Sequence, residues 1–258
     1  MAALAALIGL CAPLSACGRH AAGAGARTAA PDADSGYLAP PQPDTVRPDV
    51  DGVVVSGHGP PGAQVRLARP TGEATFATAD AQGRWTIQLG PSAEPRIFGL
   101  SATAGGRQTQ AQGYLLVTPK GQAAVLRAGA GALRVDATPG SGLRAIDFDV
   151  GGGLEITVAA QPRAAVIVRL DGRQVAQGRA DDAGRYGLSL PPAGQPPVRP
   201  GGHVVQVSGD GFSDTAGFLV SRPPPLAAGP LSSQLTPAGL RVDWMTPGGG
   251  VQSTILVH

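Results

Sequence analysis

The chain contains the same pattern of residues twice. Matched segments lie 101 to 104 residues apart. A period of this length indicates a duplicated domain, because solenoid and propeller repeats are about 20 to 50 residues long. The matched pairs are Ala63-Gln-Val-Arg-Leu67 with Val166-Ile-Val-Arg-Leu170, Ala79-Asp-Ala-Gln-Gly-Arg-Trp85 with Ala180-Asp-Asp-Ala-Gly-Arg-Tyr186, and Gly113-Tyr-Leu-Leu-Val117 with Gly217-Phe-Leu-Val-Ser221.

Each copy alternates apolar and polar residues with a period of two. Val65 and Leu67 alternate with Gln64 and Arg66, and Trp85-Thr-Ile-Gln-Leu89 repeats the alternation. This period is typical of β-strands with one buried face. Turn-forming residues separate the strands every 8 to 12 residues or so, which is the spacing of an immunoglobulin-like sandwich. The sequence therefore predicts an all-β fold with two tandem immunoglobulin-like antiparallel β-sandwiches.

A second, shorter pair of segments follows the two copies. Ala132-Leu-Arg-Val-Asp136 is echoed by Gly239-Leu-Arg-Val-Asp243, and each is followed by a Thr-Pro-Gly turn. We therefore expect a β-hairpin segment after each sandwich. The expected domains are a signal peptide (1–16), an acylated cysteine with a Pro/Ala/Gly-rich tether (17–48), the first module (49–119), a hairpin or linker (120–152), the second module (153–222), and a Pro-rich linker with a C-terminal hairpin (223–258).

The first copy resembles a known family of modules. The run from Val53 to Val117 contains VSGHGPPGAQVRL, ATADAQGRWTIQL and a closing GYLLV. It is similar to the bacterial immunoglobulin-like modules of envelope proteins, adhesins and regions beside peptidoglycan-binding domains. The second copy, with AAVIVRLDGRQVAQGRADDAGRYGLSL and GFLV, is similar too. The resemblance implies a fold and leaves function open, since such modules serve as spacers, docking surfaces and sugar binders.

The N-terminal residues indicate targeting to the cell envelope. The apolar run from Ala2 to Ala12 has the length of a signal-peptide core, whereas a membrane-spanning helix needs about 20 residues. The run leads into Leu14-Ser-Ala-Cys17, which resembles the lipobox of bacterial lipoproteins. The resemblance implies a lipid on Cys17, and Gly18 after it implies delivery to the outer membrane. We expect the residues up to Pro48 to form a disordered linker, because they are rich in Pro, Ala and Gly.

Composition and charge argue against several function classes. A net charge of +2 gives no long-range attraction for nucleic acid. Both cysteines lie in the first 17 residues, and the four histidines form no catalytic or zinc motif. Asp147 and Asp149 could converge as paired carboxylates, but we expect them on the solvent-exposed face of a hairpin strand. The sequence predicts no enzyme and no cofactor.

Five residues could contact a ligand. Trp85 and Tyr186 recur at one position, so each is either the aromatic anchor of its sandwich or a platform for stacking on sugar rings. Trp244 could be an exposed contact residue or could pack the C-terminal hairpin onto the preceding sandwich. Asp80 and Asp181 are weak candidates for calcium ligands, and we expect them instead to bond their own turns.

These observations predict a lipoprotein of the bacterial cell envelope that is held on the membrane by its N-terminal lipid. We expect it to act as a structural or protein-interaction module, a scaffold or docking unit with an envelope protein as partner. The alternative is an accessory protein that binds peptidoglycan or another glycan.

Overall fold

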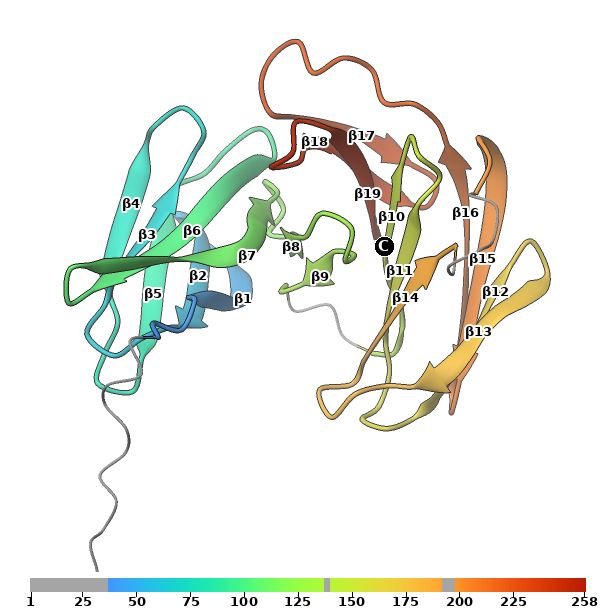
Figure 1. Cartoon of the computed structure of the whole chain (residues 1–258), viewed down its shortest axis with the longest axis horizontal. Helices are drawn as coiled ribbons and strands as arrows, with labels where there is room; N and C mark the ends of the chain where they lie inside the picture. The colour runs from blue at the N-terminus through green and yellow to red at the C-terminus, as the bar shows by residue number, and fades with distance from the viewer. Residues whose placement is uncertain (1–36, 137–139, 192–197) are drawn as a thin grey trace, which may run out of the picture. The chain divides into compact units, whose positions relative to one another are not determined.

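The computed structural model describes residues 37–136, 140–191 and 198–258, and every regular element in these ranges is a β-strand (Figure 1). The prediction of an all-β fold with tandem sandwiches is confirmed. The expected signal peptide, Cys17 and most of the expected tether lie outside the described residues. The expectation that the linker continues to Pro48 is wrong, because residues 42–49 form a strand that pairs with residues 52–58 and buries Val46 in the core. Within the described part of the chain, no helix is long and apolar enough to cross a membrane.

Sandwich 1 consists of the first nine strands, which form two antiparallel sheets. Their inward side chains share one core, which includes Val55, Leu67 and Trp85. The smaller sheet has the order β1-β2-β5, and its strands are β1 (Gln42–Asp49), β2 (Gly52–His58) and β5 (Arg84–Leu89). The larger sheet has the order β4-β3-β6-β7-β8-β9, with β4 (Ala74–Thr78), β3 (Gln64–Ala68), β6 (Arg96–Ala104), β7 (Arg107–Val117), β8 (Ala123–Leu126) and β9 (Leu133–Arg134).

Sandwich 2 consists of the remaining ten strands, again in two antiparallel sheets around one core. The four-stranded sheet has the order β13-β12-β15-β16, with β13 (Arg173–Arg179), β12 (Ala165–Leu170), β15 (Gly201–Gly209) and β16 (Phe212–Val220). The six-stranded sheet has the order β14-β11-β10-β19-β18-β17, with β14 (Arg185–Leu190), β11 (Leu154–Ala159), β10 (Gly142–Asp149), β19 (Val251–Val257), β18 (Gly239–Met245) and β17 (Leu231–Thr236).

The alternation read from the sequence is visible in the strands. On β5, Trp85, Ile87 and Leu89 are buried and the residues between them are exposed. β10 behaves differently, because its residues are buried on both faces up to Phe148. Both faces of the sheet at β10 must therefore be covered.

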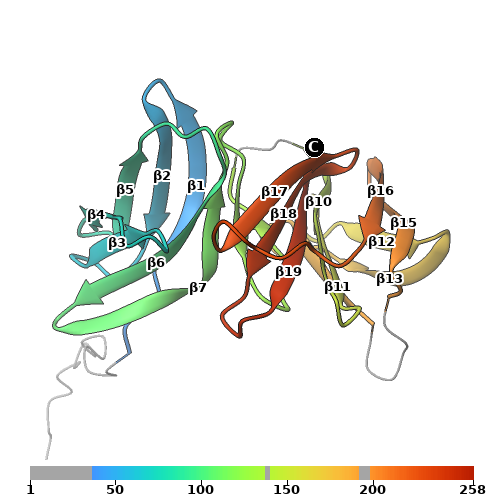
Figure 2. The ribbon, with the colours of Figure 1, turned by 90° about the horizontal axis from the view of Figure 1, so that it is seen from above.

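The segments expected to be hairpins are part of the sheets. Residues 123–134 continue the larger sheet of sandwich 1 through β8 and β9. β10, which falls in the expected linker 120–152, lies in the middle of the six-stranded sheet, with β11 on one side and β19 on the other. Figure 2 shows β17, β18 and β19 side by side next to β10. The C-terminal residues thus complete sandwich 2, with Ile255 and Val257 of β19 in its core.

Candidate functional site

The two sandwiches share a third apolar cluster, which we call the junction. It joins the larger sheet of sandwich 1 to the outer face of the six-stranded sheet of sandwich 2. This cluster explains why β10 is buried on both faces. The buried members are Ile97, Leu116, Ala124, Leu126, Ala132, Ala145, Leu240, Val242, Trp244 and Leu256.

Trp244 is fully buried in the junction. The ring of Tyr114 from sandwich 1 meets its indole edge-to-face, with centroids 6.1 Å apart. Its indole N–H donates a hydrogen bond to the Thr254 hydroxyl at 3.0 Å, so its polar atom is satisfied. The structure therefore supports the packing interpretation of Trp244 over an exposed contact residue. It packs against sandwich 1, whereas the sequence suggested that it would pack onto sandwich 2, which precedes the C-terminal strands in the chain.

Asp147 of β10 is also buried in the junction. The backbone N–H of Ala132, from sandwich 1, donates to its carboxylate at 2.8 Å, and the Thr254 hydroxyl and the Gln252 amide donate to it as well. Burial raises the pKa of Asp147 to about 6, and the hydrogen bonds to the carboxylate oppose this rise. The expectation that Asp147 lies on a solvent-exposed face is wrong, because sandwich 1 covers that face.

Asp149 does not converge with Asp147 on a substrate site. Its carboxylate accepts hydrogen bonds from the backbone N–H groups of Gly151 and Gly153, at 2.6 and 3.3 Å. Asp149 therefore fixes the turn between β10 and β11.

The repeated Leu-Arg-Val-Asp motif forms two similar ion pairs, which sequence reasoning missed. The Nε of Arg134 donates to Asp136 at 2.6 Å, and the Nε of Arg241 donates to Asp243 at 2.8 Å. Residues i and i+2 of a strand lie on one face, so the spacing itself was the available signal. Arg134 also donates to the backbone carbonyl of Val257, which adds a polar contact to the junction.

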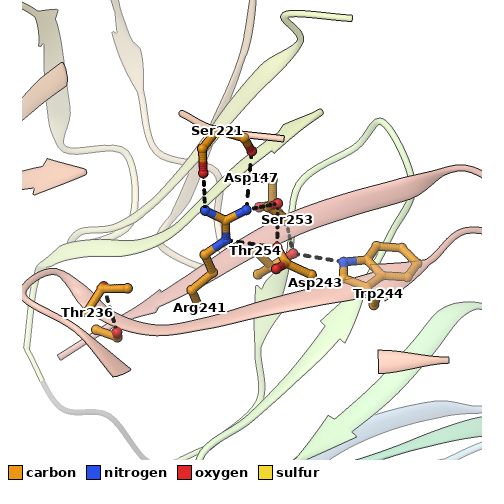
Figure 3. A network of polar contacts seen from close by, with 9 residues as sticks. Asp147, Ser221, Thr236, Arg241, Asp243, Trp244, Ser253 and Thr254 are labelled. Atoms are coloured by element: carbon orange, nitrogen blue, oxygen red, sulfur yellow. Dashed lines mark hydrogen bonds and ion pairs between the residues drawn. The ribbon is translucent and has the colours of Figure 1, made fainter. Parts of the chain in front are cut away.

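The Arg241 pair lies inside sandwich 2. Figure 3 shows its guanidinium surrounded by Asp243, Ser221 and Ser253. The guanidinium donates to the Ser221 hydroxyl at 2.7 Å and to the Ser253 hydroxyl at 3.0 Å, and it lies 5.1 Å from the ring centroid of Phe148. The network satisfies a buried charge and ties β18 to β19 and to the end of β16.

A polar groove of about 470 Å³ lies beside the junction. Strands β11 and β14 of sandwich 2 line it on one side, and residues 127–133 of sandwich 1 line it on the other. Of the residues singled out in the sequence, it brings together Tyr186 and Asp181. The chemically active side chains in its lining are Arg127, Glu155, Thr157, Asp181, Arg185, Tyr186 and Ser189.

Glu155 is the titratable group of the groove that sequence reasoning missed. It lies directly opposite Asp147 in the register of β10 and β11. Partial burial, followed by the negative charges of Asp147 and Asp149, raises the pKa of Glu155 to about 7. In the described part of the chain, no other residue donates a hydrogen bond to its carboxylate or forms an ion pair with it.

The repeated aromatic position is an anchor in both sandwiches. A Cβ added to Gly57 would lie 2.3 Å from the ring of Trp85, and one added to Gly178 would lie 2.5 Å from the ring of Tyr186. The ring of Trp85 therefore rests on a glycine of the adjacent strand β2, and the ring of Tyr186 rests on a glycine of β13 in the opposite sheet. Trp85 is 2% exposed, and Tyr186 packs against the core of sandwich 2 although it also borders the groove.

The two turn aspartates make the bonds that the turn interpretation requires. Asp80 accepts a hydrogen bond from the backbone N–H of Gln82, and Asp181 accepts one from that of Ala183, both at 2.9 Å. Each also accepts from an arginine four residues later, Arg84 or Arg185. Backbone hydrogen bonds lower the pKa of both carboxyl groups.

Strands β1 to β6 of sandwich 1 lie in the region that is similar to a known family. Residues 39–107 match the bacterial Ig domain. The matched region thus begins before β1 and ends at the first residue of β7. No match to a curated protein was found.

Solved structures give weak similarity. A chain described as the BSP domain of a biofilm-associated protein is 16% identical with a TM-score of 0.25, and the match covers 75% of this chain and 30% of that one. A tetra-tandem repeat from the extending region of a large adhesion protein is 15% identical with a TM-score of 0.25, covering 84% and 56%. The central fibronectin-III array of RIM-binding protein is 14% identical with a TM-score of 0.26, covering 86% and 89%. This chain therefore spans less than two thirds of the first two.

Proposed function

We propose that the chain is a non-catalytic lipoprotein of the bacterial envelope that docks a protein partner on its two sandwiches. The observation that carries the proposal is the junction, which uses Trp244, Asp147 and their neighbours to fix one sandwich on the other. A rigid pair of β modules positions a surface, and the outer strands of the sheets retain unpaired backbone groups that a partner can use.

The polar residues support a non-catalytic role. Asp147 and Asp149 are the paired carboxylates that an enzyme would have used. Asp147 instead accepts a hydrogen bond within the junction, and Asp149 accepts one within a turn. The buried Arg241 and Asp243 bond each other and nearby serines. These groups stabilise the fold, and Asp147, Arg241 and Asp243 are enclosed by it.

The positions of the aromatic residues favour a protein partner over a glycan. Glycan recognition by stacking needs an exposed aromatic face. Trp85 and Trp244 are buried, and Tyr186 is half-buried at the groove, with its ring packed on Gly178. We therefore propose the docking function in preference to peptidoglycan or other glycan binding.

Photo-cross-linking in cells tests the docking function. A photoreactive residue would replace exposed side chains on outer strands, Phe76 of β4, Leu219 of β16, Leu235 of β17 and Ser189 of β14. We expect an adduct with one envelope protein at one of these edges and none at Val50, an exposed turn residue that serves as the control. Absence of a specific adduct at all four edges would contradict the proposal.

Lipid labelling tests the anchor. Cells fed radiolabelled palmitate should label the wild-type chain and the Cys11→Ala variant, while the Cys17→Ala variant should remain unlabelled and leave the membrane fraction. Equal labelling of the Cys17→Ala variant would show that Cys17 is not the attachment site.

A further inference from the structure

The groove beside the junction has a free strand edge along one side. Among the residues that the structure describes, β14 pairs with β11 alone and is the outermost strand of its sheet. Five consecutive residues of β14, 185–189, line the groove. Alternate backbone N–H and C=O groups of such a strand have no partner within the sheet, so an extended peptide can pair with them.

The opposite wall of the groove is held in place before any partner binds. Arg127 donates to the backbone carbonyls of Gly131 and Ala130, at 3.0 and 2.9 Å. The backbone N–H of Gly129 donates to the Gln252 side chain at 3.2 Å, which attaches the turn to sandwich 2. A preformed wall lowers the entropy cost of binding.

Small residues keep the face of β14 open. A Cβ added to Gly187 would meet no atom within 4 Å. Ser189, the next residue on the same face, lies directly opposite Glu155 in the register of β14 and β11. A strand added to β14 would lie two strand spacings, about 10 Å, from β11. A long side chain of that strand can cross this distance over Gly187 and Ser189 to reach Glu155.

The charges in the groove determine which kind of peptide side chain can bind there. The two arginines are already engaged, Arg127 with backbone carbonyls and Arg185 with Asp181 at 3.2 Å. Glu155 has no cationic partner in the described ranges 37–136, 140–191 and 198–258, and the carboxylates of Asp147 and Asp149 on β10 add to its negative potential. A cationic side chain is the complement of this site.

We propose that the groove binds an extended peptide segment of the partner, which adds as a strand to the free edge of β14 and places a lysine or arginine on Glu155. This inference rests on the proposed docking function and names the chemistry of the partner.

Binding should depend on pH in a defined direction. The groups that face Glu155 are Asp147 and Asp149 from β10, with Arg127, Asp181 and Arg185 around the groove. Burial and the two aspartates raise the pKa of Glu155 to about 7, so the carboxyl is largely protonated in mildly acidic solution. A basic peptide requires the ionised form. Its affinity should therefore rise as the pH increases through about 7.

Selection from a displayed library of random octapeptides on the full chain tests the proposal. We expect the recovered peptides to be rich in strand-forming residues and to carry a lysine or arginine. Bound peptide should slow hydrogen exchange at the amides of β14. Gly187→Phe should fill the groove and lower the affinity for the recovered peptides about tenfold or more. Glu155→Gln should lower this affinity about tenfold.

A matched control is available on β16. Gly217 is an exposed strand glycine with no atom within 4 Å of an added Cβ, so Gly217→Phe makes the same change away from the groove. It should leave the affinity within about twofold. Thermal unfolding of both variants confirms that they fold.

Three results would overturn the proposal. In the first, no recovered peptide loses affinity in the Gly187→Phe variant. In the second, the recovered peptides lack basic residues. In the third, bound peptide leaves the hydrogen exchange of the β14 amides unchanged. If the in-cell adducts at Leu219 or Leu235 persist in the Gly187→Phe variant, the groove assignment fails and the docking function stands. Absence of adducts at all four probed strands contradicts the docking function itself.

Discussion

Trp244 shows how a single residue can join two domains. Its side chain is fully buried among groups from both sandwiches. Trp244→Ala removes this contact and leaves a cavity, so we expect the free energy of unfolding to fall by about 3 to 5 kcal/mol. Met245 is its neighbour on β18 and is 45% exposed, so Met245→Ala should cost less than about 1 kcal/mol. Urea denaturation measures the free energy of unfolding of both variants. Equally small decreases in the two would contradict the role of Trp244 in joining the sandwiches.

Asp147 makes stability depend on pH. Its pKa in the folded chain is raised from 3.8 to about 6, mainly by burial. Between these values the folded chain holds a proton that the unfolded chain has released. The contribution of Asp147 to the free energy of unfolding therefore falls as the pH rises through this window, by on the order of 3 kcal/mol, and this contribution is constant above it. The raised pKa of Glu155 acts in the same direction up to about pH 7.

Asp147→Asn isolates this contribution. Urea denaturation at several pH values between about 4 and 8 gives the free energy of unfolding of the wild type and of the variant as a function of pH. We expect the decline between pH 4 and 6 to be smaller in the variant. Asp80, Asp171 and Asp181 have lowered pKa values and titrate below this window, so they affect both proteins equally. The same decline in both proteins would show that Asp147 is not the group responsible.

At the scale of elements, the C-terminal strands complete sandwich 2. β19 pairs with β10 on one side and β18 on the other. Deleting residues 239–258 removes both and exposes the core faces of β10, so we expect sandwich 2 to unfold while sandwich 1 keeps its own core. Amide NMR spectra of the truncated chain measure this. A second set of dispersed signals matching sandwich 2 would show that the strands are dispensable.

The sequence predicted the strands better than the sheets they form. Alternation found the buried faces of β3 and β5, and the repeat found the paired anchors Trp85 and Tyr186. Periodicity shows which residues share a face but not what covers the other face. The junction depends on pairing between β10 and β19, which lie about a hundred residues apart in the chain. For this reason the burial of Asp147 and the groove around Glu155 could not be read from the pattern.

At the scale of the whole molecule, residues 38–258 form one compact unit rather than two independent domains. The junction couples the two cores through an apolar cluster and through bonds from Asp147 and Arg134. Opening one sandwich therefore exposes apolar surface of the other. We expect calorimetry of the wild-type chain to show a single cooperative transition.

A charge placed in the junction should separate the two transitions. Leu126 of β8 is fully buried in the junction and does not belong to the inner core of sandwich 1. Leu126→Lys buries an unpaired charge there, which the chain avoids by parting the sandwiches. Calorimetry should then show two transitions, each with a smaller enthalpy than that of wild type. As a control, Leu235→Lys introduces the same charge at a side chain that is 78% exposed and should keep the single transition. A single transition in the Leu126→Lys variant, shifted only in temperature, would mean that the junction is not what couples the two sandwiches.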